Sequence, residues 1–148
     1  MSRYPHVGFH FKVDFPGIGS TDADTRFQEV GGLSAEVAVE DLPVGGENSF
    51  DYKLPTKAKH GNLVLKRGFI NDSKLIEWLT NAVQHFSFKL CNVTVTLLNE
   101  NHEPCSTWIF AKAFPVKWAF SDFKAMDNGL VIETIELAYQ EFTYKSES

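Results

Sequence analysis

Apolar and polar residues alternate one by one along much of this chain, a pattern that favours β-strands over helices. Near the N-terminus, Val7, Phe9, Phe11, Val13 and Phe15 occupy every second position. Successive side chains of a strand point to opposite faces, so this run predicts a strand with one apolar face turned inward. The same pattern predicts further strands over residues 27–33, 35–42, 62–69, 91–97, 108–120 and 131–144.

One segment follows a helical pattern instead. Its apolar residues recur at helical spacing, at Leu75, Ile76, Leu79, Ala82, Val83 and Phe86. Asp72 or Ser73 is placed to cap this helix, and its apolar stripe is expected to pack on a sheet. Because the strands are joined mostly by short turns, they are expected to be antiparallel. We therefore expect a mainly β fold, an antiparallel β-sandwich or small barrel with one flanking α-helix, as a single domain over residues 1–148.

Two features interrupt the predicted strands. Residues 46–61 read as a long polar loop into which Phe50, Tyr52 and Leu54 are set. A loop of this length in a small domain is usually functional or mobile. Pro115 lies within a predicted strand, where proline indicates a kink or an edge position.

Charge and composition narrow the possible functions. The formal net charge is −5, with a pI near 5.5, so binding of nucleic acid at the surface is disfavoured. No stretch approaches the roughly 20 apolar residues that span a bilayer, and the N-terminus lacks the apolar core of a signal peptide. Cys91 and Cys105 are the only cysteines, and we expect two free thiols in a reducing compartment.

No residue pattern indicates catalysis. His6 and His10 would lie about 13 Å apart along a strand, too far for one metal ion. The glycine pairs near residues 17–19 and 31–32 lack the lysine and the helix of a phosphate loop. The carboxylates that a glycosidase could use are expected on solvated or pore-facing strand faces: Glu36, Glu40, Asp41, Glu133, Glu136 and Glu141. We therefore expect no enzyme activity, no cofactor and no metal.

An ordered series of motifs resembles a known family. Residues 27–33 read Phe-Gln-Glu-Val-Gly-Gly-Leu, and residues 42–48 read Leu-Pro-Val-Gly-Gly-Glu-Asn. Leu-Pro at 54–55, Asn-Leu-Val-Leu-Lys-Arg-Gly at 62–68 and Leu-Ile-Glu-Trp-Leu at 75–79 follow in order, with Trp118 to Tyr139 near the end. The series resembles the tail tube proteins of contractile-tailed phages, and especially the inner-tube proteins of extracellular contractile injection systems such as antifeeding-prophage particles.

The resemblance implies an assembly. In this family, subunits form hexameric rings in which strands join into a continuous β-barrel, and the rings stack into a tube inside a contractile sheath. The implied partners are other copies of the chain, the sheath protein, baseplate and tail-terminator proteins, and a protein or DNA cargo in the lumen, without stable insertion into a membrane. The implied location is the cytoplasm during assembly, and then a virion tail or a released extracellular particle.

Three surfaces follow from this picture as expectations. The strands over 35–42 and 131–144 would each pack one face on the subunit core and turn the other to the lumen. Candidate lumen residues are Glu36, Glu40, Thr134, Glu136 and Gln140, an acidic lining that would repel DNA and acidic proteins. Phe50, Tyr52 and Leu54 would contact the adjacent ring or subunit. The outer helix face would meet the sheath through Lys74, Glu77, Asn81 and Gln84.

Two alternatives stay open at this point. A paralogue that initiates or caps the tube at the baseplate would share every motif described above. A small-molecule carrier built on a closed β-barrel would explain the aromatic residues as pocket lining, although it would not explain the motif series.

Overall fold

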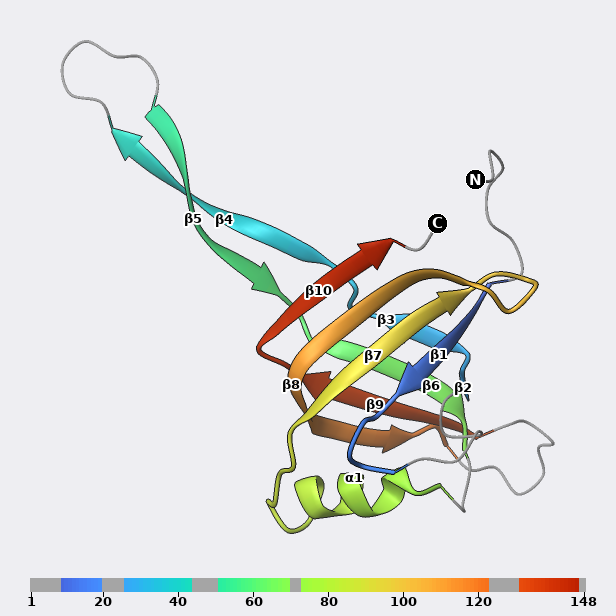
Figure 1. The fold of residues 1–148 in the computed structure, drawn as a ribbon. Coiled ribbons are helices and arrows are strands. Elements are labelled where there is room, and N and C mark those ends of the chain that lie inside the picture. The colour runs from blue at the N-terminus through green and yellow to red at the C-terminus, as the bar shows by residue number, and fades with distance from the viewer. Residues whose placement is uncertain (1–8, 20–25, 44–50, 70–72, 123–130, 147–148) are drawn as a thin grey trace. The chain divides into compact units, whose positions relative to one another are not determined.

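The computed structural model describes residues 9–19, 26–43, 51–69, 73–122 and 131–146. The chain divides into two compact units. Met1–Gly31 and Asn62–Ser148 form the first, called here the barrel unit, and Gly32–Gly61 forms the second, called the hairpin unit. Figure 1 shows both units and the labels of their elements.

The barrel unit is an antiparallel sheet that closes on itself beside one helix (Figure 1). Its sheet order is β2-β1-β7-β8-β9-β6-β3, with β10 paired to β8. The elements are β1 (His10–Asp14), β2 (Arg26–Phe27), β3 (Glu29–Gly31), β6 (Leu63–Gly68), α1 (Leu75–Val83), β7 (Cys91–Leu98), β8 (Pro104–Phe120), β9 (Ile132–Ala138) and β10 (Glu141–Ser146). Only Gln28 separates β2 from β3, and its N–H donates to the Lys66 carbonyl at 2.9 Å, so residues 26–31 join the two ends of the sheet. The predicted mainly β, antiparallel fold with one flanking helix is confirmed.

The long strand β8 bends at Lys112 and thereby serves both halves of the sheet. Lys112 has φ of 54°, and its N–H donates to the Asn92 side-chain oxygen at 3.0 Å. The pairing of β8 with β7 shifts register at the same level, between Cys91 and Val93. Such bulges let a strand pass from one sheet layer to another. A second register shift, after Pro115 in the pairing with β9, lies at the predicted proline kink.

The strand predicted over 131–144 is divided into β9 and β10, and both segments pair with β8 in the same register. Ala138 of β9 pairs with Phe114, and Glu141 of β10 pairs with Ala111. Tyr139 and Phe142 both pack on Phe110, with ring centroids 4.8 Å and 5.9 Å away. Tyr139 and Phe142, which both face inward, are thus three residues apart, whereas side chains on one face of a regular strand are two residues apart. This change of face matches the bend of β8 at Lys112 and explains why the run is divided.

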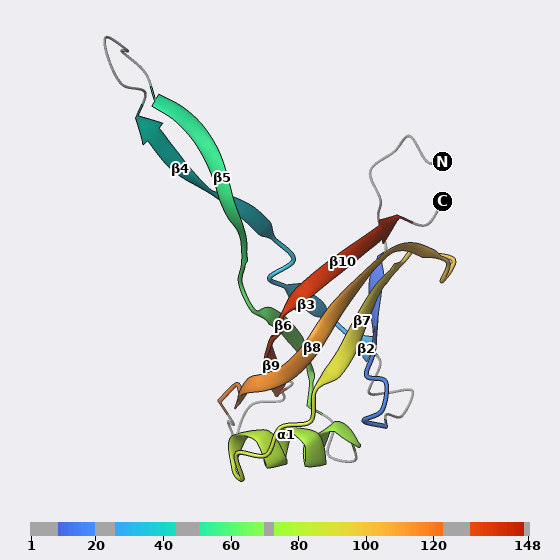
Figure 2. The same cartoon turned by 60° about the vertical axis from the view of Figure 1, so that its left-hand side comes forward.

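The helix packs on the barrel unit through Leu75, Trp78, Leu79 and Ala82, which are buried. Figure 2 shows α1 lying across one end of the strands. The predicted stripe is wrong at its C-terminal end, because α1 stops at Val83, and Phe86 is 84% exposed with φ of 52°. Ser73 Oγ accepts the Leu75 N–H at 3.1 Å, although the residue at the N-cap position is Lys74. Asp72, the other predicted cap, lies outside the described residues.

The hairpin unit consists of β4 (Ala35–Pro43) paired antiparallel with β5 (Asp51–His60). The predicted strand over 35–42 is confirmed, but the loop predicted over 46–61 is wrong for residues 51–60. Every second residue of this segment is less polar than its neighbours, namely Tyr52, Leu54, Thr56 and Ala58. The lysines and Pro55 between them are uncommon in strands, and they obscured this alternation. Val37 and Val39, expected on a core-facing side, are each 58% exposed.

Candidate assembly surfaces

The barrel unit has an open sheet edge along β10. Among the described residues, β10 pairs with β8 alone, whereas β7 pairs with β1 and β8, and β9 pairs with β6 and β8. An unpaired edge presents a row of N–H and C=O groups that can pair with another chain. Glu141, Thr143, Tyr144, Lys145 and Ser146 are all exposed along this strand. The strand order therefore offers a backbone surface for association.

The polar face of β9 carries both signs of charge. Thr134 and Glu136 are half-buried there, on the face opposite buried Ile135. Glu136 pairs across the sheet with Lys117 and accepts a hydrogen bond from the Asn62 amide at 2.9 Å. Thr134 pairs with Lys66, whose ammonium lies 3.8 Å from the Glu29 carboxylate. These lysines make the face mixed in charge, so the predicted acidic lining does not describe β9 by itself.

Two other predicted lumen residues lie on β4, and the last lies between strands. Glu36 and Glu40 share one face of the hairpin, where the residues opposite them are Lys59 and Leu54. Both glutamates are exposed. Gln140 is exposed at the break between β9 and β10, and its backbone N–H donates to the Ala111 carbonyl at 3.0 Å.

Two of the three predicted contact residues, Tyr52 and Leu54, lie on strand β5 and not on a loop. Tyr52 is 55% exposed and Leu54 is 42% exposed. The pairing of β4 with β5 places both beside Leu42, which is 47% exposed. Phe50 lies outside the described residues. A cluster of three exposed apolar side chains on a two-stranded ribbon is typical of a contact surface.

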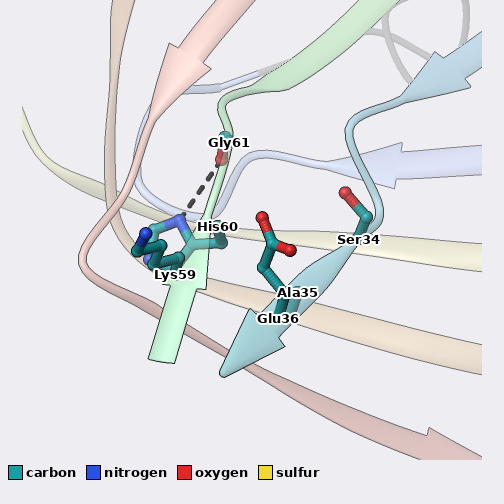
Figure 3. A pocket seen from close by; sticks show the side chains of 6 residues that line it. All are labelled: Ser34, Ala35, Glu36, Lys59, His60 and Gly61. Carbon is teal, nitrogen blue, oxygen red and sulfur yellow. Dashed lines mark hydrogen bonds between the residues drawn. The ribbon is translucent and has the colours of Figure 1, made fainter. Parts of the chain in front are cut away.

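An open hollow lies where the hairpin begins and ends, lined by Ser34, Ala35, Glu36, Lys59, His60 and Gly61 (Figure 3). The His60 ring nitrogen Nδ1 contacts the Gly61 carbonyl at 3.2 Å. Sheet register pairs His60 with Ala35 and Glu36 with Lys59. Consecutive pairs alternate between faces, so His60 and Glu36 belong to opposite faces of the ribbon.

The predicted sheath-facing residues line a hollow beside α1. Lys74, Glu77 and Asn81 border it together with Ile18 and Phe88. The following chain is fixed there, since Trp78 Nε1 donates to the Lys89 carbonyl at 2.8 Å. Lys89 Nζ donates in turn to the Gly17 carbonyl at 2.7 Å. Gln84 is exposed one residue beyond the helix, where it forms the C-cap.

Sequence reasoning missed an aromatic cluster after α1. Phe86, Phe88 and Leu90 are all exposed, and the Phe86 and Phe88 rings lie 4.9 Å apart. Phe88 also packs on Phe114 at 5.4 Å. The alternation of these apolar residues with Ser87 and Lys89 was a strand-like signal that the helical interpretation of Phe86 concealed.

A buried charged network was also missed. Arg67 Nε donates to Glu133 Oε1 at 2.7 Å, and the Trp118 indole N–H donates to Glu133 Oε2 at 2.7 Å. Arg67 Nη2 donates to Ser73 Oγ at 3.0 Å. Glu133 was expected on a polar strand face, but it is fully buried. Glu133 shares its strand face with Ile135 and Leu137, and Arg67 shares its face with Leu63 and Leu65, so the spacing could have predicted that both charges are buried, although not that they meet.

The cysteines and histidines show no metal-site arrangement in the described chain. Cys91 and Cys105 are free thiols, as predicted. Burial raises the pKa of the Cys91 thiol to about 11, and its S–H donates to the Pro16 carbonyl at 3.3 Å. No group of three or more His, Cys, Asp or Glu side chains converges among the described residues, and His6 lies outside them. None of the described helices is long and apolar enough to cross a membrane.

Solved structures share this fold, and they define its class. An anti-feeding prophage baseplate structure, 6-fold symmetrised, contains a chain with 35% identity and a TM-score of 0.82, covering 99% of this chain and 98% of that one. The sheath–tube complex of the extracellular contractile injection system PVC, in the extended state, matches with 23% identity and a TM-score of 0.78 over 98% and 94% of the two chains. Hcp1 from Flavobacterium johnsoniae has the same fold, at 16% identity and a TM-score of 0.59 over 93% and 96%. The fold is that of tube proteins in contractile injection systems.

The chain belongs to the family described as T4-like virus tail tube protein gp19, whose model matches residues 7–143. It is thus a structural tail tube protein of contractile injection systems, as the motif series predicted. A search of curated protein sequences gave no match.

Proposed function

We propose that this protein assembles as hexameric rings that stack into the inner tube of a contractile particle, which pierces a target envelope and conducts a protein or DNA cargo. The observation that carries the proposal is the family match over residues 7–143 together with the open edge of β10. Pairing of that edge with a neighbouring copy would continue the sheet around a lumen. The sheath, the baseplate and the tail terminator are its proposed partners, since the matching structures include a sheath–tube complex, a baseplate and a sheath/tube terminator.

Electron microscopy of the purified protein over a range of concentrations tests this function. Rings and hollow filaments are the expected result. A protein that stays monomeric at millimolar concentration, with a small molecule bound in its barrel, would support the carrier alternative. Assembly in the cytoplasm and later release in a particle remain part of the proposal.

The lumen lining is proposed to include Glu36, Glu40, Thr134, Glu136 and Gln140. Lys66 and Lys117 next to the β9 residues make part of that lining mixed in charge. The net charge of −5 still favours weak contact with DNA and acidic proteins. Titration of short DNA against assembled tubes at low salt should show little binding, and tight binding in the lumen would contradict this assignment.

The outer face of α1 is proposed to meet the sheath. Lys74, Glu77, Asn81 and Gln84 are polar, so a contact through them could separate during contraction more readily than an apolar one. Pull-down of sheath protein with tubes carrying Glu77→Lys tests the assignment. Unchanged sheath binding by these tubes would show that the sheath contacts another surface.

A role in initiating the tube at the baseplate is the second candidate. It is favoured by one observation, the 35% identity to a chain in a baseplate structure against 23% for a chain in a sheath–tube complex. An initiating subunit should form single rings that elongate only when the main tube protein is added. Long filaments from this protein alone would favour the main tube role.

A further inference from the structure

The hairpin unit contains one irregularity, and it determines which side chains share a face. Ala38 of β4 pairs with Lys57, and the next residue, Val39, pairs with Pro55. Thr56 is therefore an extra residue on β5, a β-bulge, and its hydroxyl donates to the Ala38 carbonyl at 3.1 Å.

Residues that pair across two strands point to the same face, so the register assigns each side chain to one side of the ribbon. One face carries an apolar group near the start of the hairpin, here called the root patch: Val37, Val39, Pro55 and Ala58. The other face carries an apolar group farther along, here called the tip patch: Leu42, Tyr52 and Leu54.

The two strands change their apolar face at the same level. On β4 the spacing of the sequence changes the apolar face, because Val39 and Leu42 are three residues apart and thus face opposite ways. On β5 the bulge changes the apolar face, because Leu54 and Ala58 would share a face on a regular strand. If the two strands changed their apolar faces at different levels, Leu42 would lie beside polar residues of β5. The bulge therefore assembles the tip patch from both strands.

Charged side chains occupy the complementary positions. The tip level of the root-patch face carries the ion pair of Lys53 with Asp41. The root level of the tip-patch face carries Glu36 opposite Lys59. Each face is thus apolar over one half and charged over the other.

Neither patch is covered within its own unit. All described side chains of the two strands are exposed except Ala38, which is half-buried. A two-stranded ribbon without a second layer is at best marginally stable in water. Exposed apolar groups of this kind indicate that another surface covers them.

We propose that self-association of this chain depends on the pairing register that the Thr56 bulge maintains, which sets a root patch and a tip patch on different ribbon faces, each covered by another copy of the protein. The inference rests on the proposed tube function. Charge supports a second copy as the occupant, because β4 carries Glu36, Glu40 and Asp41, while the sequence of β5 has three lysines, Lys53, Lys57 and Lys59, and one acidic residue, Asp51. A ribbon with one acidic and one basic strand is complementary to itself and unsuited to a polyanion.

One deletion variant and one insertion variant distinguish the effect of side-chain placement on assembly from the effect of the bulge itself. Deleting Thr56 removes the bulge but keeps every cross-strand pair, so both patches stay on their faces. Inserting a serine between Ala38 and Val39 also removes the bulge, because Thr56 gains a partner. It reverses all residues beyond that point, so Leu42, Tyr52 and Leu54 move to the face of Val37 and Ala58, while Val39 and Pro55 move to the other face.

The measurement is the concentration at which tubes form, by sedimentation and electron microscopy, in each full-length variant. The expected result is that the deletion assembles like the natural chain and the insertion requires at least about tenfold more protein. Normal assembly of the insertion variant would overturn the inference. Loss of assembly in both variants would assign the effect to the local twist of the bulge and would overturn it as well.

A substitution pair keeps the test valid if the insertion disturbs folding. Leu42→Ser with Leu54→Ser removes two of the three tip-patch side chains, whereas Asp41→Ser with Lys53→Ser changes the same level on the other face. The first pair should raise the assembly concentration at least about tenfold, and the second should change it less than about threefold. Equal effects would contradict the inference. Failure of the natural chain to form tubes would instead refute the proposed function.

Discussion

Arg67 and Glu133 form an ion pair inside the barrel unit, with Arg67 Nε 2.7 Å from Glu133 Oε1 and side chains 2% and 0% exposed. The pair joins β6 to β9, and its hydrogen bonds extend to Trp118 on β8 and to Ser73 before α1. The Arg67 guanidinium also lies 4.9 Å above the centre of the Phe27 ring on β2. One charged pair therefore connects four strands and the start of the helix.

Removing one charge of this pair should strongly destabilise the fold. Glu133→Gln removes the negative charge that Glu133 places against the buried Arg67 guanidinium, and we expect a loss of about 3–5 kcal/mol in the free energy of unfolding. Urea denaturation of the unassembled chain measures it. Glu136→Gln is the matched control, because Glu136 lies three residues farther along β9 and is only half-buried. We expect this variant to lose about 1 kcal/mol or less in the free energy of unfolding. Equal losses in the two variants would show that the pair contributes little.

Ser73 should matter through its hydroxyl alone. Ser73 Oγ accepts hydrogen bonds from Arg67 Nη2 and from the Leu75 N–H. Ser73→Ala leaves both donors without this acceptor, and we expect a loss of about 1–2 kcal/mol in the free energy of unfolding. Ser73→Thr retains the hydroxyl and should recover most of the loss. A threonine variant as unstable as the alanine variant would argue against the hydrogen bonds as the cause.

The bend of β8 should tolerate glycine and reject β-branched residues. Lys112 has φ of 54°, in the left-handed region, where a β-branched side chain clashes with the backbone. Lys112→Val should lower the free energy of unfolding by about 1–2 kcal/mol, whereas Lys112→Gly should leave it within about 1 kcal/mol. Lys117→Val, at another exposed β8 position, is the control for loss of a lysine. The backbone explanation fails if valine is tolerated equally at both positions.

Alkaline pH should weaken the fold through Cys91. Its pKa in the folded state is raised to about 11 from an ordinary value of 9.0, mainly by burial. The folded state then holds a proton that the unfolded state has lost, so stability should fall as pH rises from about 9 through about 11. Denaturation midpoints between pH 8 and 11 measure this fall. The slope should be smaller in Cys91→Ala, and an unchanged slope would show that other groups cause it.

The open edge of β10 should become protected when tubes form. Among the strands that the structure describes, only β8 pairs with β10 (Glu141–Ser146), so amide hydrogens on the other edge of β10 should exchange quickly before assembly and slowly afterwards. Mass spectrometry of exchanged tubes and subunits provides the comparison. Amides of β7, which pairs on both sides, serve as the internal control. Unchanged exchange in β10 would place the ring contact elsewhere.

Much of the fold could be predicted because burial repeats at fixed intervals along the sequence. Val13, Val93, Val95, Ile135 and Leu137 are buried at the alternating positions that predicted their strands. The assembly residues were harder to predict, since alternation shows only that a side chain leaves the core. It does not show whether water or another subunit covers the outer face, which is why Glu136 and Tyr52 could be named but not assigned.

The sequence by itself determined the strand and helix types, the family and the absence of a recognisable catalytic pattern, because these depend on residue spacing over short stretches. Tertiary structure alone decided the partners of the buried charges, the bend at Lys112 and the bulge at Thr56. Each of those features depends on which strands become neighbours, and that is settled by pairing between residues far apart in the chain. Arg67 and Glu133 are separated by 66 positions, and no local pattern encodes their meeting.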